Sequence, residues 1–517
     1  MGELAQHSSN TTSSRTKKSL KNSSVALIMY FISLILQFFS RKIFLDYLGT
    51  EILGLNTTAT NLLQFLNLAE LGIGSAIAYT LYDPLHKDDK EKICEILSLQ
   101  GWIYRKIALI VIVAAAILSA FFPLIFKKMA LPLWYAYASF GVLLFSSLLS
   151  YFVNFRQVIL SADQKDYKIQ YTYSLTQLIK VVFQILAVRY IRYGYEAWLI
   201  LEFVFTIISS VSLNRIIRKT YPYLKESKLK GIKLVKKYTE ITTKIKQLFF
   251  HKIGGFVLTQ ASPIIIYAYA SLTLVALYSN YMIMINGFLK LLNAIFNSVA
   301  GGVGNLIASG DKDRISKVFF ELLSIRFCIV ATLCFTIYMI ATPFIRIWIG
   351  AEYILENSTL ILMIAVFYIQ GTRHIVDPFI NGYGLFGDIW SPIVEASLNI
   401  GCSVLLGKFF GLNGIIAGVL ISLIIIMMFW KPYYLFSRKL PWLQKKFIRY
   451  YGSVIIIGIA IAYGLIVLIN NITLPYFTNL FELGIYALII SLLYGICLAG
   501  VLWFFKPGFA NIIRRFI

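Results

Sequence analysis

The sequence is poor in the residues from which catalytic and metal sites are usually built. It contains 5 cysteines and 4 histidines in 517 residues. These residues form no CxxC or HExxH pattern, so neither a disulfide framework nor a zinc site is indicated. A P-loop and a Gly-rich nucleotide fingerprint are also absent. Their absence excludes a self-contained ATP-driven pump.

Long polar segments are scarce as well. No loop on the expected external side is longer than about 15 residues. A membrane glycosyltransferase or polysaccharide polymerase would be expected to carry catalytic groups on a large external loop, and a His/Asp catalytic cluster is missing too. We therefore expect a protein that is not an enzyme and that needs no cofactor.

Long apolar runs, in contrast, fill most of the chain. Hydrophobic residues make up 58% of it and the mean hydropathy is +0.74, whereas soluble chains are roughly 45–50% apolar. The runs are continuous rather than alternating, so they predict membrane-spanning helices and not barrel strands. The predicted fold class is an all-α polytopic membrane protein with about 14 transmembrane helices, at roughly 23–47, 53–81, 102–126, 132–160, 170–191, 196–215, 250–270, 273–308, 317–343, 357–381, 390–408, 412–430, 449–470 and 481–505.

The positive charge lies mainly between the apolar runs. The formal net charge is +24, and its place in short loops favours membrane orientation over nucleic-acid binding. If the N-terminus is cytoplasmic, about 36 of the 48 Lys and Arg fall on the cytoplasmic side, about 8 on the outside and about 4 within spans. This asymmetry predicts that both termini are cytoplasmic.

The chain also reads as two halves. The stretch from Gly72 to Ala78 is echoed by the stretch from Gly302 to Ala308, and such repeats are typical of transporters built from paired bundles. We expect a polar cytoplasmic tail at 1–22, an N-terminal six-helix bundle at 23–215, a basic cytoplasmic linker at 216–249, a C-terminal six-helix bundle at 250–447, and two additional transmembrane helices with a short cytoplasmic tail at 448–517.

Several motifs are similar to those of one transporter family. They are Tyr47-Leu48-Gly49, Leu53-Gly54-Leu55-Asn56, Ala69–Ala76, Leu81–Leu85, Leu277–Tyr281, Ser391–Glu395 and Lys408–Gly414. In these motifs the chain resembles the bacterial polysaccharide transporter family, the oligosaccharide flippases of the multidrug/oligosaccharidyl-lipid/polysaccharide (MOP) superfamily. The resemblance implies two six-helix bundles around a V-shaped central cavity, two C-terminal helices and transport by alternating access.

The resemblance also implies a substrate and a location. Such a flippase moves an undecaprenyl-diphosphate-linked oligosaccharide repeat unit from the cytoplasmic to the periplasmic or outer leaflet of the bacterial cytoplasmic (inner) membrane. The product serves O-antigen of lipopolysaccharide, capsule or exopolysaccharide synthesis. Expected partners are this lipid, membrane lipids, and the polymerase and chain-length machinery of the pathway, but no nucleic acid. The alternative is an ion-coupled multidrug antiporter of the related extrusion branch, which would need a net acidic cavity.

Cationic side chains inside the spans are the candidates for holding the diphosphate. An unpaired charge is costly across about 30 Å of hydrocarbon, and Arg and Lys suit phosphate. Lys290 is the first candidate for binding the diphosphate. The alternative is that Lys290 forms an interhelical ion pair, for instance with Glu70. Lys180 lies on a polar stripe with Gln177 and Gln184. The full set of substrate-binding candidates is Lys290, Lys180, Arg373, Arg41, Arg156, Asn293 and Asn297.

Carboxylates inside the spans are the candidates for ion coupling, because a buried carboxylate exchanges protons near neutral pH. Glu70 is the first candidate for ion coupling. The alternative is that Glu70 makes a helix-packing hydrogen bond beside its small neighbours. Asp377 and His374 follow Arg373, and Asp377 is also placed to form an i,i+4 pair with it. With Glu395 they complete the ion-coupling set, and H⁺ and Na⁺ remain open as the coupling ion.

Overall fold

The computed structural model describes most of the chain. Its backbone is described for residues 2–517 except 71–72, 128, 164, 228, 230, 244, 246–260, 270, 298–302, 304–305, 308–309, 374, 386, 389, 472–476, 506–507 and 511–517. Side chains are described from residue 32 onward, with 69, 166, 294–295 and 297 left out as well. Within these limits the structure is helical and contains no strand, so the predicted all-α class is confirmed.

Ten helices of the described part are long and apolar enough to cross a membrane. One of them, at Trp390–Arg438, has 49 residues and contains a turn at Gly411, where φ is +55°. The chain is thus a multi-pass membrane protein, and the exact number of 14 spans stays a prediction.

The chain divides into two compact units. Unit 1 comprises Met1–Phe256 and Ser271–Ala276, and unit 2 comprises Val257–Ala270 and Leu277–Ile517. The finer division expected from the sequence, with its linker at 216–249, stays a prediction. The second copy of the proposed repeat, from Gly302 to Ala308, lies mostly outside the described residues.

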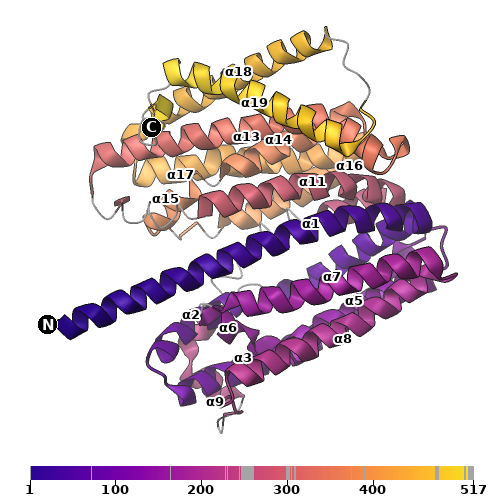
Figure 1. Cartoon of the computed structure of the whole chain (residues 1–517), viewed down its shortest axis with the longest axis vertical. Coiled ribbons are helices and arrows are strands. Elements are labelled where there is room, and N and C mark those ends of the chain that lie inside the picture. Colours follow the sequence, from indigo (N-terminus) through magenta and orange to yellow (C-terminus); the bar gives the residue numbers. More distant parts are fainter. Residues whose placement is uncertain are drawn as a thin grey trace. The chain divides into compact units, whose positions relative to one another are not determined.

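Unit 1 is built on long helices that run alongside one another (Figure 1). Helix α7 packs on α8 and α1, and α5 packs on α1, α3 and α8. Helix α1 bends at Gly49, where φ is +80°, so it supplies two successive segments. The bounds are α1 (Gly2–Leu66), η1 (Asn67–Glu70), α2 (Ile73–His86), α3 (Lys90–Ala120), α4 (Phe122–Ile125), α5 (Trp134–Phe152), η2 (Phe155–Gln157), α6 (Val158–Ala162), α7 (Asp166–Tyr190), α8 (Gly194–Thr220) and α9 (Ile232–Lys237).

The sequence predicts one continuous helix over the apolar run at 53–81, but the structure breaks this run into two helices joined by a turn. Helix α1 ends at Leu66, a 3-10 turn covers Asn67–Glu70, and α2 begins at Ile73. Side chains on other helices hold this turn, since the hydroxyls of Ser147 and Tyr151 both donate to the Asn67 side chain, at 3.0 and 2.8 Å. Polar groups of this kind stabilise broken helices in membranes.

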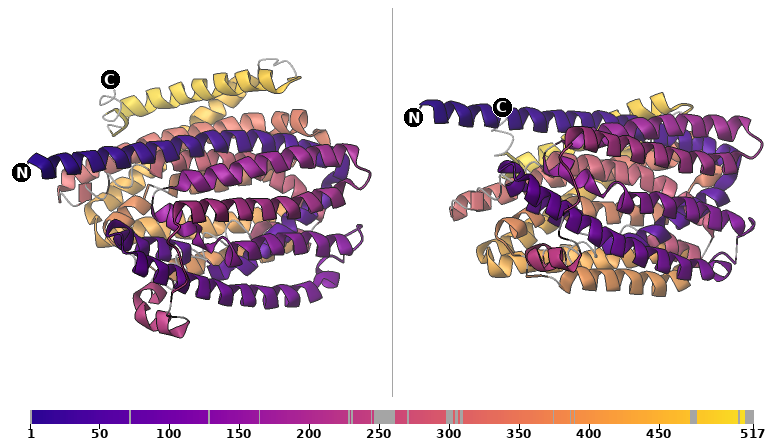
Figure 2. Two further views of the ribbon diagram at one scale, coloured as in Figure 1. Left: turned by 60° about the horizontal axis from the view of Figure 1, so that its bottom comes forward. Right: turned by 90° about the horizontal axis from the view of Figure 1, so that it is seen from below.

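Unit 2 centres on α13. Helices α14 and α19 pack on α13, α14 also packs on α16, and α18 packs on α19; the yellow pair α18 and α19 is visible in both further views (Figure 2). The bounds are α11 (Leu272–Asn297, whose first residues belong to unit 1), α13 (Lys312–Trp348), η3 (Ala351–Tyr353), α14 (Asn357–Arg373), α15 (Asp377–Gly382), α16 (Trp390–Leu423), the π-helical turn η4 (Ile424–Trp430), α17 (Lys431–Arg438), η5 (Pro441–Leu443), α18 (Gln444–Asn470) and α19 (Leu480–Phe505).

Helix α16 folds back on itself at Gly411. A Cβ atom on Gly418 would lie 2.3 Å from the Ser403 backbone nitrogen, and one on Gly414 would lie 2.1 Å from the Leu406 carbonyl oxygen. The two arms of α16 therefore pack backbone to backbone, as small residues allow in membrane helices. Gly414 belongs to the Lys408–Gly414 motif, and the tight hairpin explains why no larger residue fits at Gly414 or Gly418.

Candidate functional site

A polar cavity of about 430 Å³ lies within unit 1, between side chains of α1, α5, α7 and α8. Most residues that line this cavity carry hydroxyl, amide or charged groups, and the apolar exceptions are Leu149 and Phe205. The polar side chains are Ser33, Ser146, Ser150, Asn154, Tyr173, Ser174, Thr176, Gln177, Lys180, Glu202, Thr206, Ser209 and Ser210. A cavity with this lining is equipped to form many neutral hydrogen bonds around a small number of charges.

Lys180 meets a carboxylate in the wall of this cavity. Its Nζ lies 2.7 Å from Oε1 of Glu202, and the two side chains are only 12% and 14% exposed. Gln184 donates a hydrogen bond of 3.0 Å to the second oxygen, Oε2, of Glu202. The pair is therefore neutral as a whole and links α7 to α8. Removing one partner of a buried pair costs about 3–5 kcal/mol, because it leaves a buried charge uncompensated.

Hydroxyl groups continue the polar wall away from this pair. Thr176 donates to the hydroxyl of Ser209 at 3.2 Å, and Ser210 donates to the Asn154 side-chain oxygen at 3.1 Å. The amide of Asn154 in turn donates to the Tyr173 hydroxyl at 3.4 Å. On α7, Tyr173 and Lys180 are separated by about 10 Å along the helix axis. The polar surface is thus long enough for an extended hydroxylated ligand.

Glu70 is held in place by a neighbouring helix. The Tyr104 hydroxyl on α3 donates to Oε1 of Glu70 at 3.0 Å, and the Tyr104 ring stacks on Tyr151 with a centroid separation of 5.6 Å. The hydrogen bond matches the helix-packing alternative for Glu70. It does not exclude a role in coupling, which stays a prediction.

In unit 2, Arg373 and Asp377 form the i,i+4 pair that the sequence allowed. Helix α14 ends at Arg373, and α15 begins at Asp377. The Arg373 Nε donates to Oδ2 of Asp377 at 3.1 Å. Both charges are thus partnered within one turn of chain. His374, between them, lies outside the described residues.

A stripe of polar residues on α16 is buried in unit 2. Ser391, Glu395, Asn399 and Ser403 recur every four residues, and each is at most 2% exposed. Among the described residues, Oε1 of Glu395 and both amide atoms of Asn399 have no hydrogen-bond partner. Each buried group left unsatisfied costs about 1–3 kcal/mol, and more if it is charged. The middle of the stripe is therefore equipped to bind a proton or a cation.

Both ends of the α16 stripe, in contrast, are satisfied. Ser403 donates to the Ile415 carbonyl at 2.9 Å, and Ser391 donates to Asp388 at 2.7 Å. Asp388 lies in the connection before α16 and is also 2.9 Å from the Lys431 Nζ. Burial opposes the ionisation of Asp388, but the hydrogen bonds from Lys431 and Ser391 outweigh it and hold the pKa of Asp388 below its usual range.

The remaining candidates are spread over the two units. Lys290 on α11 is exposed and Asn293 is half-buried, while the side chain of Asn297 is not described. Arg41 is half-buried on α1. Arg156 lines a second, smaller pocket of unit 1. Of the predicted cations, the structure thus places Lys180 in the large polar cavity and Arg156 elsewhere in the same unit.

Sequence reasoning missed Glu202. A signal was present: Lys180 lies ten residues before the end of α7, and Glu202 lies eight residues after the start of α8. In two consecutive antiparallel helices, such residues lie at similar depth, so opposite charges at matching positions are expected to pair. The serines and threonines of the cavity wall were missed because single hydroxyl groups are common in membrane helices and do not mark a site.

Comparison with known proteins gives a fold and no sequence family. No family model and no curated protein matches the sequence. The structure is similar to the lipid II flippase MurJ in an inward closed conformation, with a TM-score of 0.63 and 16% identity over 92% of this chain and 98% of that one. It is also similar to an inward-facing multidrug resistance MATE family transporter of the MOP superfamily, with a TM-score of 0.59 and 12% identity over 82% and 99% of the two chains. A third match is VcmN, a MATE transporter of Vibrio cholerae, with a TM-score of 0.52, 12% identity and coverage of 83% and 99%.

These likenesses show that the chain has the fold of a MOP-type membrane transporter. The narrower assignment to the polysaccharide transporter family rests on the motifs alone.

Proposed function

We propose that the protein is a flippase for an undecaprenyl-diphosphate-linked oligosaccharide, which it moves from the cytoplasmic to the outer leaflet by alternating access. Its place would be the bacterial cytoplasmic membrane, with both termini in the cytoplasm. The observation that carries the proposal is the cavity of about 430 Å³ in unit 1, with its lining of hydroxyl and amide groups. The fold shared with a lipid II flippase supports it.

The cavity lining suits the sugar part of such a substrate. Hydroxyl groups both donate and accept hydrogen bonds, so Ser209, Ser210 and Thr176 can replace the water that a sugar loses on leaving the aqueous phase. The polyprenyl chain remains in the lipid, where it carries no polar group. The cavity therefore lowers the cost of moving the polar head group and has no need to enclose the whole molecule.

Lys180 is the proposed partner of the diphosphate in this cavity. Glu202 neutralises it at 2.7 Å, which avoids the cost of an isolated charge in the membrane. A phosphate that approaches the Lys180 ammonium competes with Glu202 for it. Arg41, Arg156, Arg373 and Lys290, with Asn293 and Asn297, are the further proposed contacts for the head group.

Glu395 is the proposed coupling residue, with Asn399 beside it. A proton or Na⁺ bound there would satisfy the oxygen of Glu395 that has no partner among the described residues. Each elementary charge that crosses the membrane gains about 2.3 kcal/mol per 100 mV, so ion entry can drive the cycle. Glu70, Asp377 and His374 are secondary candidates, and the polymerase and chain-length machinery of the pathway are proposed partners.

Complementation tests the proposal. A strain that lacks its polysaccharide flippase but makes this protein's own lipid-linked glycan would receive the native chain, Lys180→Met/Glu202→Gln, or the surface control Lys87→Gln. We expect surface polysaccharide to return with the native chain and the control. We expect it to be lost with the double variant, which removes both charges and leaves none unpaired.

Two outcomes contradict the proposal at different levels. If the double variant restores polysaccharide as well as the native chain, the Lys180–Glu202 pair is structural and the diphosphate binds elsewhere. If the native chain restores nothing at normal membrane abundance, the flippase assignment is wrong.

A multidrug antiporter is the second candidate, and one observation favours it. Glu202 places a carboxylate in the cavity wall, which is the group that a cationic drug requires, and MATE transporters share the fold. Export of cationic dyes from cells that express the native chain, abolished by Glu202→Gln and unaffected by loss of the lipid-linked glycan, would establish this function instead.

A further inference from the structure

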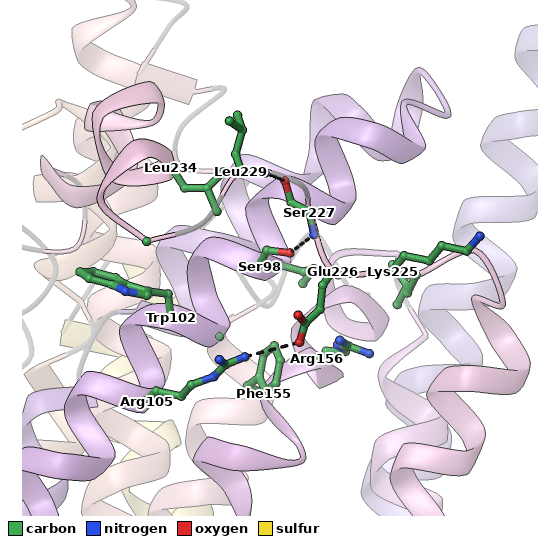
Figure 3. Close-up of a pocket in the computed structure, with 14 residues that line it drawn as sticks. Ser98, Trp102, Arg105, Phe155, Arg156, Lys225, Glu226, Ser227, Leu229 and Leu234 are labelled. Atoms are coloured by element: carbon green, nitrogen blue, oxygen red, sulfur yellow. Dashed lines mark hydrogen bonds and ion pairs between the residues drawn. The ribbon is translucent and has the colours of Figure 1, made fainter.

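A second pocket of unit 1, of about 150 Å³, carries charges of which the proposed transport uses only Arg156. It lies between α3, η2 and the connection from α8 to α9 (Figure 3). Its charged lining residues are Arg105, Arg156, Lys225 and Glu226, which gives a net charge of +2. The remainder of the wall is mainly apolar and includes Leu97, Trp102, Phe155, Leu224, Leu229 and Leu234. The pocket thus combines cations with an apolar border.

The walls of this pocket are tied together by specific contacts. The backbone N–H of Ser227 donates to the Ser98 hydroxyl at 2.9 Å, and the N–H of Leu229 donates to the Ser227 hydroxyl at 3.1 Å. A Cβ atom on Gly231 would lie 3.2 Å from Nε1 of Trp102. The connection is therefore packed closely against α3 and holds the pocket open as a defined shape.

The cations of the pocket are only weakly neutralised. Arg105 Nη2 lies 3.6 Å from Oε1 of Glu226, and both side chains are 61% exposed, so this pair contributes little. Arg156 lies over the Phe155 ring, 5.4 Å from its centroid. In the view of Figure 3, Glu226 lies between the two guanidinium groups and Lys225 points away from them. Two fork-shaped donors are thus available to an anion that displaces one weakly held carboxylate.

The pocket lies where α3 enters the membrane. After Arg105 and Lys106, α3 has no charged residue up to its end at Ala120. Leu109 and Ile112, at i+4 and i+7 from Arg105 and so on the same face of the helix, are 58% and 39% exposed. The Lys106 Nζ is 5.9 Å from the Trp102 ring centroid, and such Trp and Lys residues mark membrane interfaces. Arg105 therefore lies at head-group level, directly above a lipid-facing stripe.

We propose that this pocket binds the head group of an anionic phospholipid of the adjacent leaflet. The phosphate contacts Arg105 and Arg156, and an acyl chain runs along Leu109 and Ile112. Basic pockets at this level bind anionic head groups in membrane proteins. A pocket of about 150 Å³ suits a phosphate with a small alcohol. The inference shares Arg156 with the proposed transport function and otherwise uses residues that the transport proposal does not name.

Lipid binding by the purified full-length chain in nanodiscs tests the proposal. Phosphatidylglycerol and phosphatidylcholine with the same acyl chains would be supplied as spin-labelled probes, and the protein-associated fraction of each would be measured. The test variant is Arg105→Gln/Arg156→Gln. The control is Lys87→Gln/Lys90→Gln, which removes the same charge from lysines that are 67% and 55% exposed.

We expect the test variant to lose roughly 25-fold in phosphatidylglycerol association, because each interfacial cation contributes a factor of about five. The control variant should keep the native value, and phosphatidylcholine should show no change. Leu224→Trp, which fills the pocket and keeps every charge, should reproduce the loss. The melting temperature of each variant in detergent shows that the loss does not come from unfolding.

Three results would overturn the proposal. The first is an equal loss in the control variant, which would mean a diffuse surface charge. The second is native phosphatidylglycerol association in either test variant. The third is complete displacement of the labelled lipid by millimolar inorganic phosphate, which would mean a site for the free anion.

Discussion

The two units use polar residues in opposite ways. In unit 1 the hydroxyl groups, Lys180 and Glu202 surround a cavity and find partners there. In unit 2, Glu395 and Asn399 are buried in packed helices, and Oε1 of Glu395 and both amide atoms of Asn399 lack hydrogen-bond partners among the described residues. Individual helices differ in packing: 17% of the most apolar stretch of α8 in unit 1 is buried, against 56% for α13 and 22% for α19 in unit 2. Unit 1 thus places these polar groups around a cavity, whereas unit 2 buries Glu395 and Asn399 among packed side chains.

The largest expected effect concerns the ion pair of unit 1. Lys180→Ala leaves the Glu202 carboxylate buried and uncompensated, so we expect a loss of about 3–5 kcal/mol in the free energy of unfolding. Lys180→Met/Glu202→Gln should be close to the native protein. Thermal unfolding in detergent measures both. A single variant as stable as the double variant would show that water already solvates Glu202.

The next effect concerns the backbone contact of unit 2. A side chain at Gly418 would meet the Ser403 backbone nitrogen, so Gly418→Leu must separate the arms of α16. We expect a loss of about 3 kcal/mol, at the upper end of the usual cost of overpacking. Gly401→Leu on the same helix is the matched control, because a Cβ there has nothing within 4 Å. Equal melting temperatures for the two variants would contradict the close packing.

The third prediction has the opposite sign. Asn399→Leu removes two buried amide atoms that lack partners, so we expect a gain of about 1–3 kcal/mol in stability. Asn413→Leu should lose stability instead, because Asn413 donates to Ser358 at 3.0 Å and accepts from Thr359 at 2.5 Å. Chemical denaturation measures the free energy of unfolding of both variants. If Asn399→Leu is destabilised like Asn413→Leu, the amide of Asn399 is satisfied by bound water or an ion.

The smallest effect returns to unit 1. Tyr104→Phe removes the hydrogen bond to Glu70 and keeps the ring stacked on Tyr151, so we expect a loss of about 1–2 kcal/mol. Tyr463→Phe, at a position that is 70% exposed, should change nothing. Melting curves of the two variants provide the measurement. If Tyr104→Phe loses transport while its melting temperature stays close to that of the native protein, Glu70 has a role in coupling and not only in helix packing.

The class of fold was predictable because membrane solvation dictates it. A chain with long apolar runs has to satisfy its backbone within each span, which leaves helices. Lys180 with Gln177, and Arg373 with Asp377, were predictable because helical spacing alone puts them on one face.

What the sequence did not reveal depends on partners from other helices. The 3-10 turn at Asn67–Glu70 requires hydroxyls from α3 and α5, and the charge of Lys180 is compensated by Glu202 on α8. The periodicity of the sequence predicts which residues share one face of a helix, but it does not predict which other helix packs against that face. The unsatisfied atoms of Glu395 and Asn399 are likewise a property of the surrounding packing and not of spacing.

The folded-back helix α16 has a mechanical consequence. Its two arms touch through backbone atoms at Gly414 and Gly418, and Ser403 is hydrogen-bonded across them to Ile415. The side chain of Ile415 also packs between the arms, since its Cγ1 lies 2.7 Å from the position of a Cβ atom on Gly407. We therefore expect movement of the arm that carries Glu395 to be transmitted to the second arm, so that the two arms of α16 move together.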